Sequence, residues 1–296
     1  FITDGGMETT LIFENGLELA HFASFVLLDD QQGLEALRNY YASYLTLAHE
    51  QGVGIILDTP TWRANPDWGN RLGYSAADLE DVNRRGVALL EELRPETDEG
   101  PLLVISGCLG PRGDGYRVDA VMRPDEAERY HTPQIRTFAD TSADLVTALT
   151  LTYADEAIGV VRAARNAGIP AVISFTVETD GRLPDGQSLG EAIEAVDEAT
   201  DESAAYFMLN CAHPTHFESV LEGPWIGRLR GLRANASSKS HAELDEATEL
   251  DSGDPLELAT QYATLRSRNP HITVVGGCCG TDQRHIREIC AVAVAS

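Results

Sequence analysis

Two adjacent cysteines, Cys278 and Cys279, lie between paired glycines in the segment VVGGCCGT at residues 274–281. Adjacent cysteines rarely form a disulfide with each other because the small ring strains the peptide bond that joins them. Packing, metal binding or a reactive free thiol are therefore the chemical alternatives. A third cysteine, Cys211, follows another apolar segment, YFMLN. Three thiolates brought together repel one another unless a cation neutralises them, and Zn²⁺ suits them because it is borderline soft and tetrahedral.

Three sulfur ligands leave one of the four positions around Zn²⁺ open, as in catalytic sites. Other interpretations stay open on these residues alone. The three cysteines can be buried and inert, and a Gly-Gly turn can bind a phosphate group. His213 and His216 follow Cys211 with the spacing C-x-H-x-x-H, so either is a rival ligand. Cys290 lies within a predicted helix, where we expect a buried thiol of the core.

Eight short apolar or β-branched segments alternate with amphipathic segments along the whole chain. Several read as continuous apolar runs, for example VGIILDT and ITVVGG, which is typical of parallel strands covered on both faces. Strands are expected at 1–4, 53–59, 102–107, 145–150, 171–176, 206–211, 229–234 and 272–276. This alternation predicts an α/β protein with a single (β/α)₈ TIM barrel over residues 1–296. A doubly wound sheet is the alternative, but DGGMETTL lacks its G-x-G-x-x-G spacing.

Barrel enzymes place their chemistry at the carboxyl ends of the strands. Cys108, Cys211 and the Cys278–Cys279 pair all follow predicted strand ends. The strands at 206–211 and 272–276 are two apart around the barrel, so Cys211 can face the pair across the mouth. The glycines around the pair give the backbone the freedom for both neighbouring thiols to reach one cation.

The chain carries 47 acidic and 22 basic residues, a formal net charge of −25 at pH 7. This charge predicts no nucleic acid and no anionic membrane as partner, because phosphate binding needs clustered Arg and Lys. No apolar run approaches the ~20 residues of a membrane span, and no signal peptide is visible. Five scattered cysteines indicate reduced thiols in a cytoplasmic protein and not a disulfide framework. A homo-oligomer is compatible with the sequence.

The chain resembles the homocysteine S-methyltransferase family along nearly its whole length. The matching segments are DGGMETTL at the first predicted strand, LNCAHP at the sixth and VVGGCCGT at the eighth, together with ISGCLGP and ISFTVETDGRLPDG. The resemblance implies a (β/α)₈ barrel in which Cys211, Cys278 and Cys279 bind Zn²⁺. It also implies a reaction of methionine biosynthesis, in which a methyl group passes from a sulfonium, betaine or folate-linked donor to the sulfur of homocysteine.

The same resemblance places further residues around the substrate. Asp4, Gly5 and Gly6 match the first-strand motif near the bound amino acid, and Thr59 and Asn235 match positions that line the pocket. The expected partners are therefore a small-molecule thiol and a methyl donor. The chain shows no cobalamin-binding or folate-binding module, which favours a small-molecule donor of the sulfonium or betaine type.

Two segments differ from the family pattern. The family usually places a glutamate at the end of strand four, where it holds the substrate's ammonium group, and Leu149 occupies that position here. The second strand ends in Asp-Thr-Pro-Thr-Trp, residues 58–62, where the family more commonly has a Thr-Asn-Thr-Tyr pattern. We expect an altered amino-acid clamp. Either the acceptor is a thiol without an α-amino group, with Leu149 as an apolar contact, or Glu178 replaces the missing ammonium partner.

The expected reaction needs the thiolate of the acceptor, which coordination to Zn²⁺ favours without a separate general base. Aromatic faces can hold a cationic donor, and the candidates are Trp62, Trp68, Phe175 and Tyr116. A Schiff-base aldolase on the same fold is a rival function, and its nucleophile has to be Lys239, the one lysine of the chain. A zinc-binding barrel that has lost homocysteine turnover is a second alternative, suggested by the missing glutamate.

Overall fold

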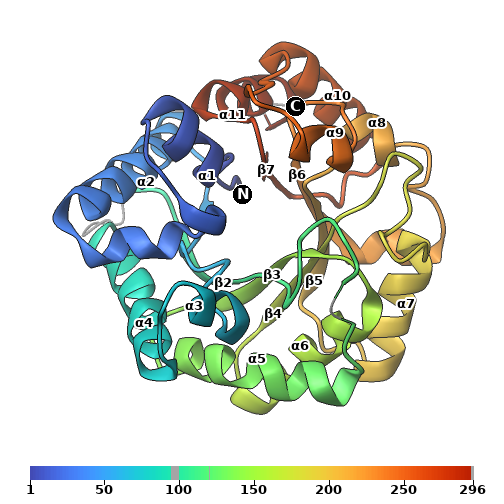
Figure 1. Cartoon of the computed structure of the whole chain (residues 1–296). Coiled ribbons are helices and arrows are strands. Elements are labelled where there is room, and N and C mark those ends of the chain that lie inside the picture. The colour runs from blue at the N-terminus through green and yellow to red at the C-terminus, as the bar shows by residue number, and fades with distance from the viewer. Residues whose placement is uncertain (95–99, 120, 295–296) are drawn as a thin grey trace.

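A computed structural model describes residues 1–94, 100–119 and 121–294 of the chain. Within these residues, parallel strands form one seven-stranded sheet whose neighbours follow the chain order. The strands are β1 (Ile55–Asp58), β2 (Leu103–Leu109), β3 (Leu145–Leu151), β4 (Ala171–Phe175), β5 (Tyr206–Asn210), β6 (Leu229–Ala234) and β7 (Val274–Gly277). Figure 1 shows the sheet curled at the centre of the molecule, with the helices arranged around it. The architecture is therefore α/β, as predicted.

The N-terminal segment, predicted as the first strand, is present only as bridges at one residue. Ile2 forms parallel bridges with Ile55 of β1 and with Val275 of β7. The Ile2 amide donates to the Gly54 carbonyl at 2.9 Å, and the Val275 amide donates to the Phe1 carbonyl at 3.1 Å. The segment thus lies between the two edges of the seven-stranded sheet (Figure 1).

The other predicted strands each coincide with an observed strand to within two residues at either end. The helices between and after them are α1 (Met7–Thr9), α2 (Gln31–Gln51), α3 (Pro66–Arg71), α4 (Ala76–Glu92), α5 (Pro124–Ala139), α6 (Ala154–Ala167), α7 (Leu189–Thr200), α8 (Pro214–Phe217), α9 (His241–Asp245), α10 (Pro255–Arg268) and α11 (Gln283–Ile289). Short 3₁₀ or π segments cover Thr10–Glu14, Ala20–Phe22, Ser24–Asp29, Pro224–Arg228 and Cys290–Val294. Across the described ranges, none of these helices combines the length and apolar character needed to cross a membrane.

Local signals in the sequence set the ends of the main helices. Helices α2 and α6 end at Gly52 and Gly168, which adopt the left-handed conformation with φ of +63° and +76°. Helix α7 begins with a capping box in which the Ser188 side chain accepts from the Glu191 amide. These signals stop each helix where the chain must turn back toward the next parallel strand.

Side chains inside the curled sheet change from apolar to polar along the strands. Alternate residues of a strand point to the same face, so positions two apart share the interior. An apolar interior layer consists of Ile56, Val104, Leu145, Val172, Met208 and Val274. Two residues further along, the interior is polar, with Asp58, Ser106, Thr147, Ser174 and Asn210. The polar layer is the one nearest the carboxyl ends of the strands, where the sequence places the candidate site.

The opposite face of the sheet packs against the helices. Leu57, Ile105 and Ile173 are fully buried there and belong to the main hydrophobic core. Because helices cover this face all round, the strands are apolar on both faces over most of their length, which explains their continuous apolar runs.

Candidate metal and thiol site

Three cysteine sulfurs converge at the carboxyl ends of β5 and β7. Cys211 follows β5, and Cys278 and Cys279 follow β7. Their Sγ atoms all lie within 4.8 Å of one another, and those of Cys211 and Cys279 are 4.0 Å apart. Among the described residues, this is the one group of three His, Cys, Asp or Glu side chains close enough to hold a metal ion. The convergence expected from the sequence is present, and the cluster fits a metal site.

Cys211 and Cys278 are joined by a disulfide, with their Cα atoms 5.4 Å apart. The expectation of reduced thiols throughout is therefore wrong for this pair. The cause is the same convergence that builds the cluster, because two sulfurs brought together can either oxidise or share a cation. Cys108, Cys279 and Cys290 are free. Cys290 is buried in the core, as predicted.

The turn after β7 depends on glycine at two positions. Gly280 has φ of +79°, in the left-handed region. A Cβ on Gly276 would lie 1.8 Å from Thr3 Oγ1, so no larger residue fits there. The Cys278 amide donates to the Ala234 carbonyl of β6 at 2.8 Å. These features bend the chain so that the adjacent thiols both face Cys211.

Cys211 is held in an uncommon backbone conformation. Its φ is +55°, and the left-handed region costs a residue with a Cβ about 1–2 kcal/mol. Three side chains donate to its carbonyl: Asn235 Nδ2 at 3.0 Å, His241 Nε2 at 2.7 Å and Thr176 Oγ1 at 3.4 Å. Asn235 Oδ1 is buried and has no hydrogen-bond partner in the described structure. The strain thus lies at a predicted ligand and is compensated by residues from other strand ends.

Tyr116 and His241 meet beside the sulfurs from two separate loops. Tyr116, in the segment after β2, places its hydroxyl 3.5 Å from Cys279 Sγ. Its ring stacks on His241 at the start of α9, with centroids 4.1 Å apart and an interplanar angle of 13°. Glu178 Oε1 lies 3.2 Å from His241 Nδ1. Because both ring nitrogens of His241 face oxygen acceptors, neither is available as a base for a bound thiol.

His213 and His216 lie outside the cluster. His213 Nδ1 is 2.9 Å from Thr215 Oγ1 at the start of α8, and His216 Nε2 is 2.9 Å from the Ser238 carbonyl oxygen. Burial lowers the pKa of His213 to about 4, and the nearby His216 contributes to the fall. Neither histidine belongs to the metal-ligating group of the described residues, so the rival ligand set is not assembled.

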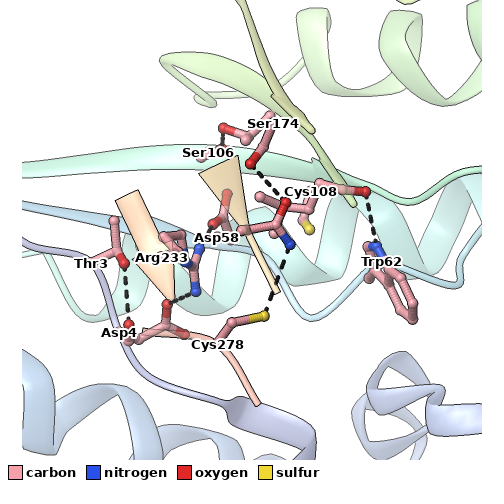
Figure 2. A network of polar contacts seen from close by, with 12 residues as sticks. Thr3, Asp4, Asp58, Trp62, Ser106, Cys108, Ser174, Arg233 and Cys278 are labelled. Atoms are coloured by element: carbon pink, nitrogen blue, oxygen red, sulfur yellow. Dashed lines mark hydrogen bonds and ion pairs between the residues drawn. The ribbon is translucent and has the colours of Figure 1, made fainter. Parts of the chain in front are cut away.

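Asp4 belongs to a buried ion-pair network. Arg233 of β6 pairs with Asp4 at 2.5 Å and also with Asp58 at the end of β1 (Figure 2). The Tyr40 hydroxyl donates to the second oxygen of Asp4 at 3.0 Å. Burial raises the pKa of Asp4 to about 6 against the opposing charge of Arg233. Asn210, the partner of Arg233 in the register of β5 and β6, donates through Nδ2 to Cys278 Sγ at 3.8 Å.

The remaining predicted pocket residues fall into two groups. Gly5 and Gly6 connect Asp4 to α1, and the Gly6 amide donates to the Thr281 carbonyl of the cysteine turn at 2.9 Å. Thr59 Oγ1 accepts from the Cys108 amide at 2.9 Å and is buried. The glycines therefore lie beside the cysteine turn, whereas the Thr59 side chain is occupied inside the sheet.

Leu149 lies at the end of β3, where the register with β4 shifts. The next residue, Thr150, has φ of +62°. Asn210 fixes it, because the Thr150 amide donates to Asn210 Oδ1 at 2.8 Å and Asn210 Nδ2 donates to Thr150 Oγ1 at 2.7 Å. Leu149 is partly buried, and its carbonyl accepts from Trp62 Nε1 at 3.3 Å. The position supplies no carboxylate, as the sequence indicates.

Three of the aromatic residues predicted to hold a cationic donor contact other groups. Phe175 is fully buried and stacks on Phe207 with centroids 6.2 Å apart. The Arg63 guanidinium lies over the rings of both Trp62 and Trp68, 3.9 Å from each centroid. Phe175 is therefore a core residue, and the two tryptophans hold a cation of the protein itself.

Two charged residues at this end of the sheet escape the sequence patterns. Glu8 in α1 is partly buried, and its Oε1 accepts from Ser24 Oγ at 2.8 Å. Arg63 is 6 % exposed and donates through Nη1 to the Gly113 carbonyl at 3.0 Å, while its buried Nε has no partner in the described structure. Each follows a strand-end motif directly, DGGM or DTPTW, and a charge in that place is the signal that can find them.

Known proteins resemble this chain over most of its length. The family profile described as homocysteine S-methyltransferase matches residues 1–293. The homocysteine S-methyltransferase YbgG of Bacillus subtilis (strain 168) is 22% identical over 313 residues, covering 99% of this chain and 94% of YbgG. The methionine synthase of Mycobacterium leprae (strain TN) is 29% identical over 292 residues, covering 90% of this chain and 23% of that protein.

Solved structures of the homocysteine methyltransferase MmuM from Escherichia coli have the same TIM-barrel-type fold. The oxidized form gives a TM-score of 0.78 at 21% identity, covering 98% of this chain and 95% of MmuM. The metallated form gives 0.76 at 20% identity with the same coverage. The profile match over nearly the whole chain shows that this protein is a methyltransferase and belongs to the homocysteine S-methyltransferase family.

Proposed function

We propose that the protein transfers a methyl group from a small-molecule donor of the sulfonium or betaine type to the thiol of homocysteine or a related thiol. Zn²⁺ held by Cys211, Cys278 and Cys279 is part of this proposal. The observation that supports it most directly is the convergence of three cysteine sulfurs in a member of this family. YbgG and MmuM are named as homocysteine methyltransferases, and one MmuM structure is named as metallated.

The three sulfurs fit Zn²⁺ once the cysteines are reduced. Sulfur ligands about 2.3 Å from a tetrahedral ion lie about 3.8 Å from one another. The Sγ atoms of Cys211 and Cys279 are 4.0 Å apart. When bound, the ion supplies a positive charge that favours the thiolate form of the acceptor. Because Cys211 and Cys278 are joined by a disulfide, we expect metal binding to require a reductant.

The protein's own residues orient the cluster, and the proposed reaction needs no separate base for the thiol. Three side chains donate to the Cys211 carbonyl and hold its left-handed backbone. The Tyr116 hydroxyl, 3.5 Å from Cys279 Sγ, can donate to a thiolate there. The remaining catalytic contribution is alignment of the acceptor sulfur with the donor methyl group for in-line displacement.

The acceptor pocket is proposed to consist of Asp4, Gly5, Gly6, Thr59 and Asn235, as the family resemblance implies. Asn235 is supported by its buried Oδ1, which has no partner in the described structure and lies beside Cys211. Glu178 stays a predicted partner of the acceptor's ammonium group. Its side chain is 37% exposed and shares its carboxylate with His241.

The N-terminal segment is proposed to complete a (β/α)₈ barrel, so that residues 1–296 form one catalytic unit. Ile2 bridges both edges of the sheet, and the Gly277 amide donates to the Asp4 carbonyl at 2.9 Å. The fold shared with MmuM over 98% of this chain supports the same arrangement.

Two rival functions are less well supported. The aldolase needs a buried lysine, but Lys239 is 47% exposed and its Nζ pairs with Asp251 at 3.2 Å. A zinc-binding protein without turnover retains the cysteine cluster, so metal analysis cannot separate it from the methyltransferase. Only a turnover assay makes that distinction.

The experiment is a methyl-transfer assay on reduced, zinc-loaded protein. Homocysteine and other small thiols are incubated in turn with S-methylmethionine, S-adenosylmethionine and glycine betaine, and the methylated thiol is detected by mass spectrometry. We expect one pair to give product, with Cys279→Ser inactive and Cys290→Ser active. Bound zinc without product from any pair would support the zinc-binding alternative.

A further inference from the structure

An amino-acid acceptor needs an anion for its ammonium group, and neither position that the family resemblance offers supplies an unpaired carboxylate here. Leu149 carries no charge. Asp4 is 1% exposed, and its two oxygens are taken by Arg233 at 2.5 Å and by Tyr40 at 3.0 Å. The proposed function therefore requires a carboxylate from elsewhere at the mouth.

Glu8 offers a carboxylate close to the cysteine turn. It lies in α1, which rests on the cysteine turn, because the Gly280 amide donates to Thr9 Oγ1 at 3.2 Å. Glu8 Oε1 accepts from Ser24 Oγ at 2.8 Å, and no ion pair within 4.0 Å engages the carboxylate in the described structure. The Ser24 hydroxyl also lies 3.3 Å from the Pro60 carbonyl oxygen. The carboxylate is thus fixed between the cysteine turn and the end of β1.

Arg63 offers the opposite charge at the same end of the sheet. Its guanidinium lies between the Trp62 and Trp68 rings, 3.9 Å from each centroid, and one nitrogen donates to the Gly113 carbonyl. The buried Nε has no partner in the described structure. A planar guanidinium held in this way is suited to donate two hydrogen bonds to a carboxylate.

These two charges act on each other without forming an ion pair. Burial raises the pKa of Glu8, while hydrogen bonds from Ser24 and from the Glu8 backbone amide, and then the charges of Arg233 and Arg63, oppose the rise. Burial lowers the pKa of Arg63 to about 10, while Asp114 and Glu8 oppose the fall. No ion pair within 4.0 Å joins Glu8 and Arg63 in the described structure. Opposite charges that lie at the same end of the sheet without forming an ion pair are complementary to the two charges of a zwitterion.

We propose that Glu8 binds the ammonium group and Arg63 the carboxylate group of an α-amino acid acceptor whose thiol lies at the cysteine cluster. The proposal rests on the proposed function for the location of the thiol. It refines that function by making the acceptor's headgroup, and not only its sulfur, a determinant of specificity.

Glu178 is the competing carboxylate. Its Oε1 lies 3.2 Å from His241, and His241 in turn donates to the Cys211 carbonyl at 2.7 Å. Removing the charge of Glu178 therefore disturbs the support of Cys211 and should affect all thiols alike. Removing the charge of Glu8 should affect only thiols that carry an ammonium group.

The test is equilibrium binding of three thiols to the reduced, zinc-loaded chain, measured by isothermal titration calorimetry without a methyl donor. Homocysteine carries both headgroup charges, 4-mercaptobutanoate lacks the ammonium group, and 3-aminopropanethiol lacks the carboxylate. Glu8→Gln should weaken homocysteine and 3-aminopropanethiol about 10- to 100-fold and 4-mercaptobutanoate less than about twofold. Arg63→Gln should weaken homocysteine and 4-mercaptobutanoate and spare 3-aminopropanethiol.

Two controls separate recognition from damage to the fold. Glu178→Gln makes the same carboxylate-to-amide change at the competing position. Arg63→Lys keeps the positive charge but loses the planar fork, so it should weaken only the thiols that carry a carboxylate. Thermal unfolding of each variant shows whether the substitution leaves the fold intact, above all at Arg63, which packs between two indole rings.

Equal losses for all three thiols in Glu8→Gln, or an ammonium-specific loss in Glu178→Gln, would overturn the assignment. So would a change in the donor KM with acceptor binding unaltered, or a wild-type chain that binds none of the three thiols. Selective binding losses in a protein that turns over no donor would support the headgroup assignment and count against the proposed function.

Discussion

The proposed site has a sulfur side, formed by Cys211, Cys278 and Cys279, and a headgroup side, formed by Glu8 and Arg63. The two sides are built in different ways. On the sulfur side, the main chain places the three cysteines, through a left-handed residue after β5 and a glycine-dependent turn after β7. On the headgroup side, side-chain contacts place the charges, with Ser24 holding Glu8 and two indole rings holding Arg63. In the proposed site, the position of the sulfurs thus depends on main-chain geometry, whereas acceptor selection would depend on side chains that can change while the sheet stays the same.

The two sides also differ in charge. The groups nearest the sulfurs are the hydroxyl of Tyr116 and the amide of Asn210. The charge of Arg233, which pairs with both Asp4 and Asp58, also acts on Glu8 of the headgroup side. Buried charges are costly unless they are paired, and Arg233 compensates two carboxylates at once. Charged side chains therefore lie on the proposed headgroup side, whereas the two side chains that contact the sulfurs are uncharged.

The largest expected effect concerns the sulfur side. Reduced wild-type protein should hold about one zinc per chain, and Cys279→Ser or the double change Cys278→Ser/Cys279→Ser should lose it because three thiolates are needed. Atomic emission spectrometry after gel filtration measures the content. Cys290→Ser is the matched control and should keep its zinc, because that buried thiol lies outside the cluster. Full zinc occupancy in the double variant would contradict the assignment of the cysteine pair as zinc ligands.

The second prediction replaces the carboxylate of Glu8 by a new carboxylate at position 149. Leu149→Glu restores a carboxylate at the position where the family usually has one. In the Glu8→Gln background it should recover about tenfold in homocysteine affinity, since a charge-assisted hydrogen bond is regained. Calorimetric titration of the single and double variants measures the recovery. A double variant weaker than Glu8→Gln alone would mean that Leu149 and Glu8 do not face the same ammonium group.

The third prediction concerns the buried ion-pair network of Asp4, Asp58 and Arg233. Burial raises the pKa of Asp4 from 3.8 to about 6, so the folded protein binds this proton more tightly than the unfolded chain. By linkage, protonation of Asp4 stabilises the fold fully below pH 3.8, the pKa in the unfolded chain. This stabilisation is on the order of 1–3 kcal/mol and is lost as the pH rises through about 6. Urea unfolding at a series of pH values should show this loss in wild type. Asp4→Asn has no such proton and should be flatter over the same interval.

The smallest expected effect is at Lys239. Its ion pair with Asp251 is exposed, and such pairs contribute about 0–1 kcal/mol. Lys239→Ala should therefore leave methyl transfer unchanged and stability nearly so. Borohydride treatment with a carbonyl substrate should label no lysine. A labelled Lys239 in the mass spectrum would favour the aldolase class. It would contradict the methyl-transfer function on which the division into two sides depends.

Much of the fold follows from local patterns in the sequence. Continuous apolar runs predict strands such as Ala171–Phe175 because both faces of the sheet are covered. Glycine and capping residues predict the helix ends. The cysteine cluster also follows, because cysteines at strand ends two apart in a barrel must face one mouth. The first strand does not follow, since Ile2 is held only by bridges from two strands far along the chain.

The headgroup side could not be predicted in the same way. Glu8 and Arg63 are single charges next to recognisable motifs, and nothing in their spacing shows that they lie at one mouth. The Arg233 network depends on the register of β6 relative to β1 and the N-terminal segment, which is a long-range property. The Cys211–Cys278 disulfide depends on oxidation as well as position. Sequence periodicity describes which face a residue occupies, but it does not say which residues meet across a closed interior.

The N-terminal segment lies between β1 and β7, so the mouth draws on both ends of the described chain. Asp4 and Glu8 come from one end and the cysteine pair from the other, and no partly folded chain can bring them together. A ligand that binds only the completed mouth raises the free energy of unfolding by an amount that grows with the logarithm of its concentration. If zinc and the acceptor bind at this mouth as proposed, each should therefore also stabilise the closed sheet against unfolding.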